Sequence, residues 1–469
     1  MATRIKPDND NVDIDPETQV SEESPLLQNT SPQRDGPSKA FRRRTLGMCM
    51  LALLMVEVSQ FIMNPPTKKI IEDIICRQHY PDHAIQSYWI EDLRCKDSPV
   101  QKTLAMVQGW AQAFEMGVHI FSIWAILGDS VFFLIGGGGQ MAVAMVYTIV
   151  ADVVPVAERT DMFFRLVALV LVFNVIFNPI SAWLMEYDPW LSMWIGFGFM
   201  VFGTLCILLI PETMHLRRKD EDERHDENQQ ADVVHLSKDG VLKQAWFSIK
   251  NDMQHVWRFI FASKSIMMLM FSVALFVPTR ITLTGVMLQY MSKRFDWSWS
   301  KATYISTIGI IATVVCYLIV LPVTSDSLNK SRRYKSRPIA RDLLLARVSI
   351  AIMTVGLLLM GVAGSPWLFI VSLITVSVGN SFVALSRALL NALVEPHTIA
   401  TLNTTVSVVE VLMGMTAPAM SWVLAKGIEL GDSWMGLPFV ITGMLAVMTT
   451  IMLFAVRLPS SGIAQAHVG

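Results

Sequence analysis

The chain has 469 residues, of which 52% are hydrophobic and 16% are charged, and its formal net charge is −1. Because soluble domains carry roughly 25% charged residues, this composition excludes an ordinary soluble domain. No basic stretch interleaved with aromatic residues is present, so nucleic acid is not an expected partner. The apolar residues come in blocks of about twenty, the length that crosses a bilayer core. We therefore predict an all-α, polytopic membrane protein.

The chain opens with a polar stretch, residues 1–44, that is rich in Pro, Ser, Asp and Asn and is predicted to be a disordered tail. Lys39 and the run Arg42–Arg44 precede the first apolar span, 46–63. Cationic residues that flank a span stay on the cytoplasmic side, so this tail is predicted to be cytoplasmic.

Within the tail, Glu22 is followed by Leu26-Leu27. This pattern resembles the acidic dileucine signal that sorts membrane proteins to endosomes and vacuoles, although so short a pattern also arises by chance. The expected location is the plasma membrane or a vacuolar or endosomal membrane.

Asn64-Pro65-Pro66 is expected to end the first span, since proline lacks the N–H that a helix needs. Residues 64–100 then form an external loop that holds Cys76 and Cys95. An oxidising exterior permits a disulfide between these two cysteines, and the alternative is two unpaired thiols. The remaining cysteines lie inside apolar segments, where cysteine behaves as a small hydrophobe.

Further apolar segments follow the first along the chain. They lie at 103–127, 131–151, 165–185, 190–210, 265–291, 303–322, 343–362, 367–394, 398–424 and 435–456. Two basic connections, Arg217-Arg218-Lys219 and 330–341, are expected on the cytoplasmic side. The predicted domains are an N-terminal bundle at 45–210, a cytoplasmic linker at 211–260, a C-terminal six-helix bundle at 261–456 and a tail at 457–469.

The number of apolar segments conflicts with this topology. Five segments precede the linker, and five crossings that start from a cytoplasmic tail would place Arg217-Arg218-Lys219 outside. One segment of the first half therefore does not cross, or a helix is missing. The suspect is 103–127, where Gln108, Gln112, Glu115 and His119 share one helical face. Such a stripe either lines a water-filled cavity or keeps the helix, distorted or non-crossing, in the membrane interface.

Several stretches resemble the major facilitator superfamily, and more closely its fungal branch related to proton-coupled folate-type carriers. The stretches that carry the resemblance are Cys76-Arg77, Cys95-Lys96, Val100-Gln101, Glu158-Arg159-Thr160, Phe163–Arg165, Pro211-Glu212-Thr213, Ser386–Glu395, Leu402–Glu410 and Gly436–Phe439. The resemblance implies two pseudo-symmetric helical bundles that carry a small organic solute by alternating access, coupled to protons. It implies a monomer with no cofactor.

One family signature is absent from the sequence. The cytoplasmic string G-x-x-x-D-x-x-G-R-[RK] is not present, and Trp110–Phe114 runs within a short distance into Ile126–Ser130. The comparison with the family implies that one helix and the signature loop are missing, which leaves ten or eleven helical segments instead of twelve. The alternative to a working transporter is a transport-incompetent remnant, or a sensor or scaffold; a lost exon would leave the same trace.

Ionisable residues inside the spans are the first candidates for solute or proton binding. Glu57 lies mid-span with Gln60 one turn further on, and burial in apolar surroundings favours the protonated form of a carboxyl group. The alternative for Glu57 is a structural hydrogen bond. Arg280 follows Pro278 and suits an anionic solute or a carboxylate such as Glu57, unless it snorkels to the membrane edge.

The spans 367–394 and 398–424 add further candidates. Arg387 and Asn391 share a face of 367–394, and Glu410 lies in the next span. Together they form a charge pair or line the cavity, and for Arg387 a purely structural pairing is the alternative. Asn174 and Asn178, one turn apart in 165–185, are expected to make hydrogen bonds between helices. The full set of solute- or proton-binding candidates is Glu57, Gln60, Glu115, His119, Arg280, Arg387, Asn391 and Glu410.

A second set of charges is expected to act in gating. Gly136–Gly139 open an apolar stretch that ends in a charged turn, as a moving helix requires. The gating candidates are Asp152, Glu158, Arg159, Arg165, Asp342 and Arg347, with ordinary interfacial charge as the alternative. No phosphate-binding, metal-ligand or nucleophile-elbow motif occurs, so neither an enzyme nor a metal site is expected.

Overall fold

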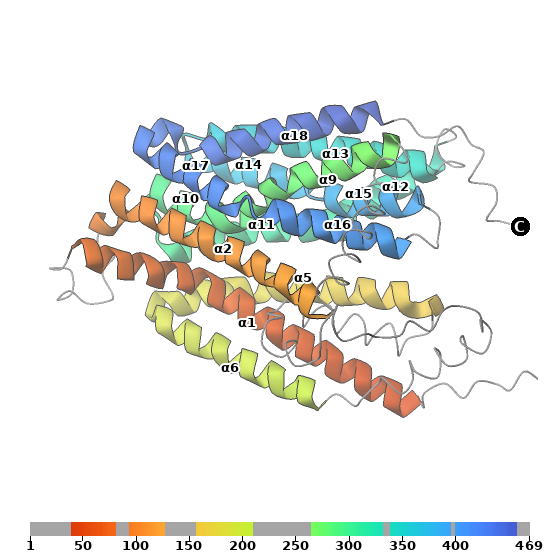
Figure 1. Cartoon of the computed structure of the whole chain (residues 1–469), viewed down its shortest axis with the longest axis horizontal. Helices are drawn as coiled ribbons and strands as arrows, with labels where there is room; N and C mark the ends of the chain where they lie inside the picture. Colours follow the sequence, from red (N-terminus) through yellow and green to blue (C-terminus); the bar gives the residue numbers. More distant parts are fainter. Residues whose placement is uncertain are drawn as a thin grey trace, which may run out of the picture.

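A computed structural model describes residues 39–80, 93–126, 156–209, 264–331, 338–394 and 399–456. Side chains at some helix ends, 114–126 and 156–167 among them, are not described. Within these ranges every regular element is a helix (Figure 1). Outside the described residues lie 1–38 of the predicted N-terminal tail, the tail 457–469, the predicted segment 131–151, the linker 211–260 and the sorting pattern at Glu22. Residues 39–44, predicted to be disordered, are helical instead.

The described helices fall into two groups along the chain. The first half contains α1 (Lys39–His79), η2 (Leu93–Lys96), α2 (Ser98–Ile126), α5 (Val156–Tyr187) and α6 (Pro189–Leu208). The second half contains α9 (Lys264–Ile281), η3 (Thr282–Val286), α10 (Met287–Arg294), α11 (Trp299–Val315), η4 (Cys316–Val320), α12 (Leu321–Lys330), α13 (Pro338–Gly361), α14 (Pro366–Gly379), α15 (Phe382–Ala392), α16 (Ile399–Gly414), α17 (Ala417–Leu430), η6 (Asp432–Trp434) and α18 (Leu437–Ala455).

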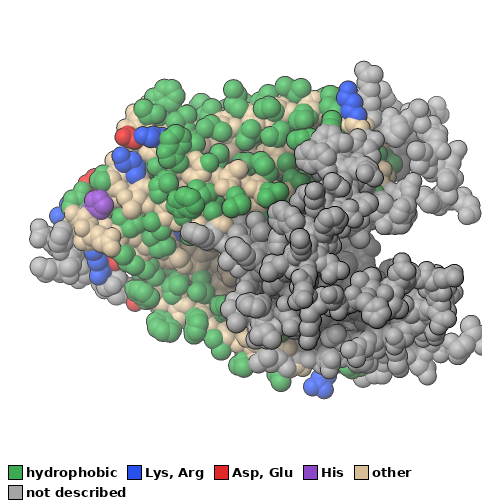
Figure 2. Space-filling model, in the orientation of Figure 1, with side chains coloured by type: hydrophobic (Ala, Val, Ile, Leu, Met, Phe, Trp, Pro, Cys, Tyr) green, Lys and Arg blue, Asp and Glu red, His purple; other side chains and the backbone are tan. Residues whose placement is uncertain are grey.

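The prediction of an all-α polytopic membrane protein is confirmed. Among the described residues, nine helices are long and apolar enough to cross a membrane. Their flanks expose large apolar side chains, such as Trp194 of α6, Trp367 of α14 and Met444 of α18. Figure 2 shows hydrophobic side chains along the visible flanks, with charged side chains near the ends. This surface suits a lipid environment.

The first helix is longer than predicted, and the expectation that Asn64-Pro65-Pro66 ends it is wrong. Helix α1 continues through both prolines to His79. Pro66 cannot donate to the carbonyl of Ile62, but the hydroxyls of Ser181 and Ser192 donate to that oxygen instead, at 2.8 and 3.2 Å. Neighbouring helices commonly satisfy a carbonyl that proline leaves open in a membrane. The predicted external loop 64–100 is therefore helical up to residue 79.

The disulfide between Cys76 and Cys95 is confirmed, with the two Cα atoms 5.1 Å apart. It ties the end of α1 to η2, just before α2 begins. A disulfide is typical of an oxidising compartment, so this end of the molecule is called the outer end below.

Helix α2 carries the predicted polar stripe. It is a continuous α-helix of 29 residues, roughly 43 Å at 1.5 Å per residue, so the expected distortion is not present over this range. Gln112 Nε2 donates to Thr284 Oγ1 of η3 at 3.3 Å, and a Cβ on Gly109 would meet Ser421 at 2.6 Å. Gln112 of the stripe therefore contacts the second half.

The two halves are joined by polar contacts near the outer end. Asn178 of α5 donates to Thr307 of α11 at 3.0 Å, which confirms its role between helices. Lys68 of α1 donates to the carbonyls of Thr284 and Gly285 at 3.0 and 3.2 Å. In Figure 1, α1 and α6 approach the second half at the outer end and diverge from it toward the start of α1.

We predict that replacing Ser181 and Ser192 together by alanine lowers stability. The change leaves the Ile62 carbonyl without its two donors, and an unsatisfied buried polar group costs about 1–3 kcal/mol. The apparent unfolding temperature in detergent should fall. As a control, Thr204→Ala removes an exposed bond to the carbonyl of its own helix, at Met200, and should leave the temperature unchanged. Equal temperatures for both variants would contradict this account of the proline-containing helix.

Candidate functional site

Three charged side chains meet in the second half. Arg387 Nη2 of α15 lies 2.6 Å from Glu410 Oε1 of α16. Arg280 Nη1 of α9 lies 3.8 Å from the other carboxylate oxygen, Oε2. One carboxylate is thus shared by two guanidinium groups from two other helices, and we call these three residues the charged triad. The predicted charge pair of Arg387 and Glu410 is confirmed.

Local helix geometry places Arg280 close to the contacts that join the halves. Pro278 lies inside α9, and the chain then widens into the single π-helical turn η3. π-Helical turns of this kind are frequent at functional sites. Arg280 lies one turn before Thr284, whose carbonyl and hydroxyl contact Lys68 and Gln112 of the first half. The triad therefore lies directly inward of the contacts that join the halves.

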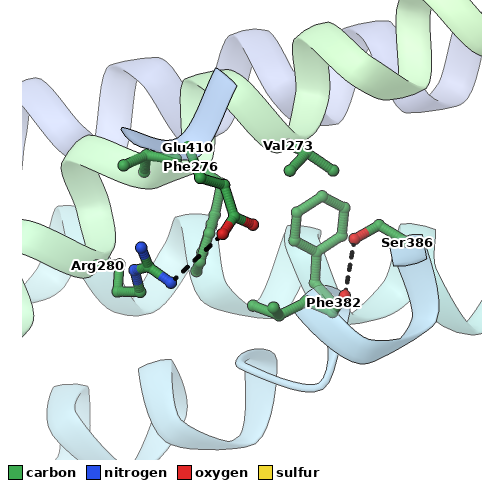
Figure 3. A pocket seen from close by; sticks show the side chains of 8 residues that line it. Val273, Phe276, Arg280, Phe382, Ser386 and Glu410 are labelled. Carbon is green, nitrogen blue, oxygen red and sulfur yellow. Dashed lines mark hydrogen bonds and ion pairs between the residues drawn. The ribbon is translucent and has the colours of Figure 1, made fainter. Parts of the chain in front are cut away.

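A pocket opens beside the triad (Figure 3). Arg280 and Glu410 form its charged edge, and Phe276 and Phe382 present aromatic rings 5.6 Å apart, centroid to centroid. The other lining residues are Val273, Val277, Val383 and Ser386. The pocket is small, with a cavity volume of about 20 Å³, room for about one water molecule.

The charges of the triad do not cancel. Two guanidinium groups face one carboxylate, which leaves a formal excess of one positive charge. The side chains of Arg280 and Arg387 are 44% and 48% exposed, whereas that of Glu410 is 15% exposed. Each guanidinium has five donors in a planar fork, so donors remain for a further acceptor. The triad can therefore hold an anionic group of a solute.

The sequence offered Arg280 an anionic solute or a carboxylate such as Glu57 as its partner; in the structure its partner is a carboxylate, that of Glu410. Glu57 is half-buried and Gln60 is exposed. The spacing of Glu57 and Lys68, eleven residues, places them on one face of α1. Because Lys68 contacts η3, this face is directed toward the second half. Gln60 lies off this face, about 60° around the helix from Glu57.

The other predicted solute-binding residues divide in two groups. Asn391 is half-buried, and its Oδ1 atom is buried with no hydrogen-bond partner among the described residues. It lies one turn from Arg387 on α15. Glu115 and His119 lie on α2, and their side chains are outside the described set.

The predicted gating residues of the second half have separate, local partners. Asp342 accepts from Arg341 Nε at 2.8 Å. Arg347 donates to the carbonyls at the end of α18, including Leu453 and Val456 at 3.1 and 2.8 Å. Arg347 therefore caps a helix end, a favourable position for a cation. Asp152 and the side chains of Glu158, Arg159 and Arg165 lie outside the described residues.

Sequence reasoning missed one buried polar cluster at the outer end. Glu72 and Lys96 form an ion pair at 3.1 Å, close to Gln101 and Trp299. Glu72 was not considered because Pro65-Pro66 was expected to end the helix before it. The signal that could have revealed it is spacing, since Lys68, Glu72 and Cys76 recur at every fourth residue.

The fold has the form of a membrane transport protein: membrane-crossing helices in two halves, and a charged, partly apolar pocket lined by α9, α15 and α16 of the second half. A family model for the major facilitator superfamily matches residues 120–418. The chain belongs to the major facilitator superfamily, whose members are secondary transporters of small solutes.

Relatives of known type are similar over most of the chain. The MFS efflux pump atnC of Emericella nidulans is 24% identical, and the match covers 93% of each chain. The MFS-type transporter avaK of Aspergillus versicolor is 25% identical, over 88% of this chain and 93% of the relative. Among solved structures, a bacterial homolog of the human lysosomal transporter Spinster matches 90% of this chain and 98% of its own, at 12% identity and a TM-score of 0.49.

We predict unequal coupling within the charged triad. A double-mutant cycle between Arg387→Met and Glu410→Gln should give a coupling of about 1 kcal/mol, because the contact is short and partly exposed. The cycle between Arg280→Met and Glu410→Gln should give less than about half of that, since the charges are further apart. Unfolding of the purified variants in detergent measures both. A stronger coupling for Arg280 would contradict the observed geometry.

Proposed function

We propose that the chain carries a small organic solute with an anionic group across the membrane by alternating access, and that protons drive the transport. The charged triad binds the anionic group of the solute. The single observation that carries this proposal is the carboxylate of Glu410 shared by Arg280 and Arg387.

Support for the solute class comes from charge and exposure. The excess positive charge and the exposed guanidinium donors suit an acceptor that competes with Glu410 for the arginines. The efflux pumps among the fungal relatives support export as the direction of transport. A monomer in the plasma membrane or a vacuolar membrane is part of the same proposal.

Support for proton coupling comes from Glu57. It is a half-buried carboxyl group inside a membrane-crossing helix, on the face directed toward the second half. Ionisable residues in such positions mark proton and substrate pathways. In this proposal Glu57 binds and releases the coupling proton, while the triad holds the solute.

A second candidate is a transporter-like protein of the fungal folate-carrier type that no longer moves solute. The observation that favours it is the missing signature string in the sequence between Trp110 and Ser130. A chain that has lost one helix and the signature loop there would act as a sensor or scaffold. Measurement of flux separates the two candidates.

We predict that the purified chain in liposomes moves labelled organic anions faster when a pH gradient is imposed. Arg387→Met should lower this flux by about ten- to a hundredfold, because a hydrogen bond to a charged group contributes about 1.5–3 kcal/mol. Lys426→Met removes an exposed pair with Glu429 at 2.9 Å and should have no effect. No flux for any anion of a broad panel would favour the second candidate.

We also predict that Glu57→Gln separates proton coupling from solute movement. The variant should still exchange solute across the membrane, because the triad is intact, but the pH gradient should no longer accelerate net flux. Gln60→Asn, a change at the exposed neighbour, serves as the control. Unchanged pH dependence in Glu57→Gln would remove Glu57 from the mechanism.

A further inference from the structure

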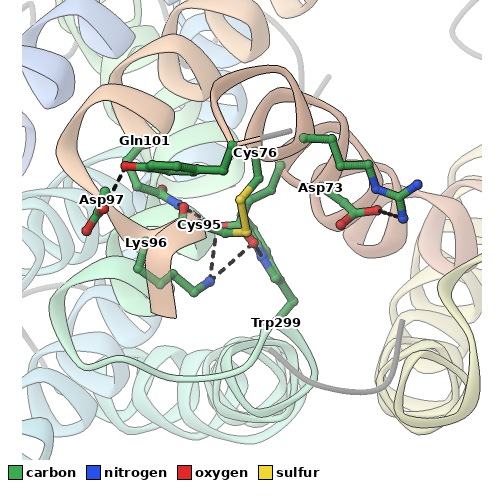
Figure 4. Close-up of a disulfide and its surroundings, with 10 residues drawn as sticks. Asp73, Cys76, Cys95, Lys96, Asp97, Gln101 and Trp299 are labelled. Atoms are coloured by element: carbon green, nitrogen blue, oxygen red, sulfur yellow. Dashed lines mark hydrogen bonds and ion pairs between the residues drawn. A yellow bond between two sulfur atoms is a disulfide. The ribbon is translucent and has the colours of Figure 1, made fainter. Parts of the chain in front are cut away.

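A buried carboxylate lies at the centre of a polar cluster at the outer end (Figure 4). Glu72 accepts from Lys96 Nζ at 3.1 Å, and also from Gln101 Nε2 and Trp299 Nε1. The side chains of Glu72 and Lys96 are each 8% exposed. A carboxylate and an ammonium group are thus both removed from water, and each depends on the other for charge compensation.

The cluster joins the two halves. Glu72 belongs to α1, Lys96 to η2 and Gln101 to α2, all in the first half. Their partners belong to the second half: Lys96 Nζ donates to Ser292 Oγ at 2.5 Å, and Gln289 Nε2 donates to the Gln101 carbonyl at 2.8 Å. The ring of Trp299 lies 5.2 Å from Lys96 Nζ. We call Glu72, Lys96, Gln101, Gln289, Ser292 and Trp299 the outer cluster.

The disulfide fixes the position of the lysine in this cluster. Cys76 lies one turn after Glu72 on α1, and Cys95 directly precedes Lys96. The bond between the two cysteines therefore attaches the lysine to the helix that carries its carboxylate. Gln101 Nε2 also donates to the Cys95 carbonyl at 3.0 Å. The cation is held in place by a covalent link and a hydrogen bond.

We propose that the contacts of the Glu72–Lys96 pair with Trp299 and Ser292 form the outer gate of the transport cycle, and that the disulfide acts as a positioning device for Lys96. The proposal rests on the alternating access of the proposed function. For the triad to open toward the outer side, the halves have to separate at the outer cluster. Separation takes Trp299 and Ser292 away from the pair, so the pair keeps the outer end closed until water or solute replaces these partners.

The test is the distance between the outer ends of the halves, measured by electron paramagnetic resonance on the full chain in nanodiscs. Spin labels are placed at Ile74→Cys of α1 and Leu430→Cys of α17, which are 50% and 61% exposed. The buried cysteines Cys49, Cys206 and Cys316 are replaced by alanine. The parent protein should show mainly the short distance of the closed outer end.

Glu72→Gln should raise the outer-open fraction about tenfold or more, because it leaves Lys96 buried without its counterion. Lys96→Met should act in the same direction. The double variant should lie closer to the parent than either single variant, since it leaves no uncompensated charge. Cys76→Ser with Cys95→Ser should also open the outer end. This last variant tests the gate independently if Glu72→Gln does not fold.

The matched control is Asp73→Asn. Asp73 is the next residue on α1 and pairs with Arg77 at 2.9 Å. The side chain of Asp73 is 29% exposed and that of Arg77 is 37% exposed. This variant should keep the distance distribution of the parent. A folded Glu72→Gln protein with the distances of the parent would overturn the gate. Because the readout is conformational, a chain without flux contradicts the proposed function alone, whereas unchanged distances in a transporting chain contradict the gate alone.

Discussion

The structure depends on one constraint: a charged group inside a membrane needs a partner or water. The chain meets this constraint by pairing its intramembrane charges with one another or with backbone carbonyls. Glu410 is shared by two arginines, Glu72 is paired with Lys96, and Lys68 donates to two backbone carbonyls. The contacts of Lys68 and of the Glu72–Lys96 pair cross between the halves, whereas the triad lies within the second half, one turn of α9 from η3. These charged groups therefore also determine which helix surfaces pack against each other.

This arrangement separates two tasks along the interface. At the outer end the charged groups of Glu72 and Lys96 are buried and hydrogen-bonded to several partners, which suits a closed gate. In the triad the arginines remain about half exposed, which suits exchange of one acceptor for another. The π-helical turn η3 lies between the two regions and contacts Lys68 and Gln112 of the first half. A change in the triad can reach the outer contacts through this turn, because Arg280 and Thr284 are one turn apart.

Much of the fold and half of the site could be predicted from the sequence. Apolar blocks identified the helices, and ionisable residues within them identified Arg280, Arg387 and Glu410, because charge is rare in such segments. The partner of Arg280 could not be predicted, since pairing between distant helices depends on how they pack. Glu72 was missed because Pro65-Pro66 signals a helix end in isolation. Two serines of other helices, Ser181 and Ser192, compensate for the proline, and local sequence does not show them.

The central claim is that the triad faces a water-accessible space between the halves, reached from the side opposite the disulfide. Labelling of Ser407→Cys with a membrane-impermeant thiol reagent tests it most directly. Ser407 is exposed and lies one turn before Glu410 on α16, so the triad stays intact. Leu412→Cys, an exposed apolar position on the same helix, is the control that should face lipid. The account predicts fast labelling of Ser407→Cys from the N-terminal side of the membrane only; labelling no faster than at Leu412→Cys, from either side, would contradict it.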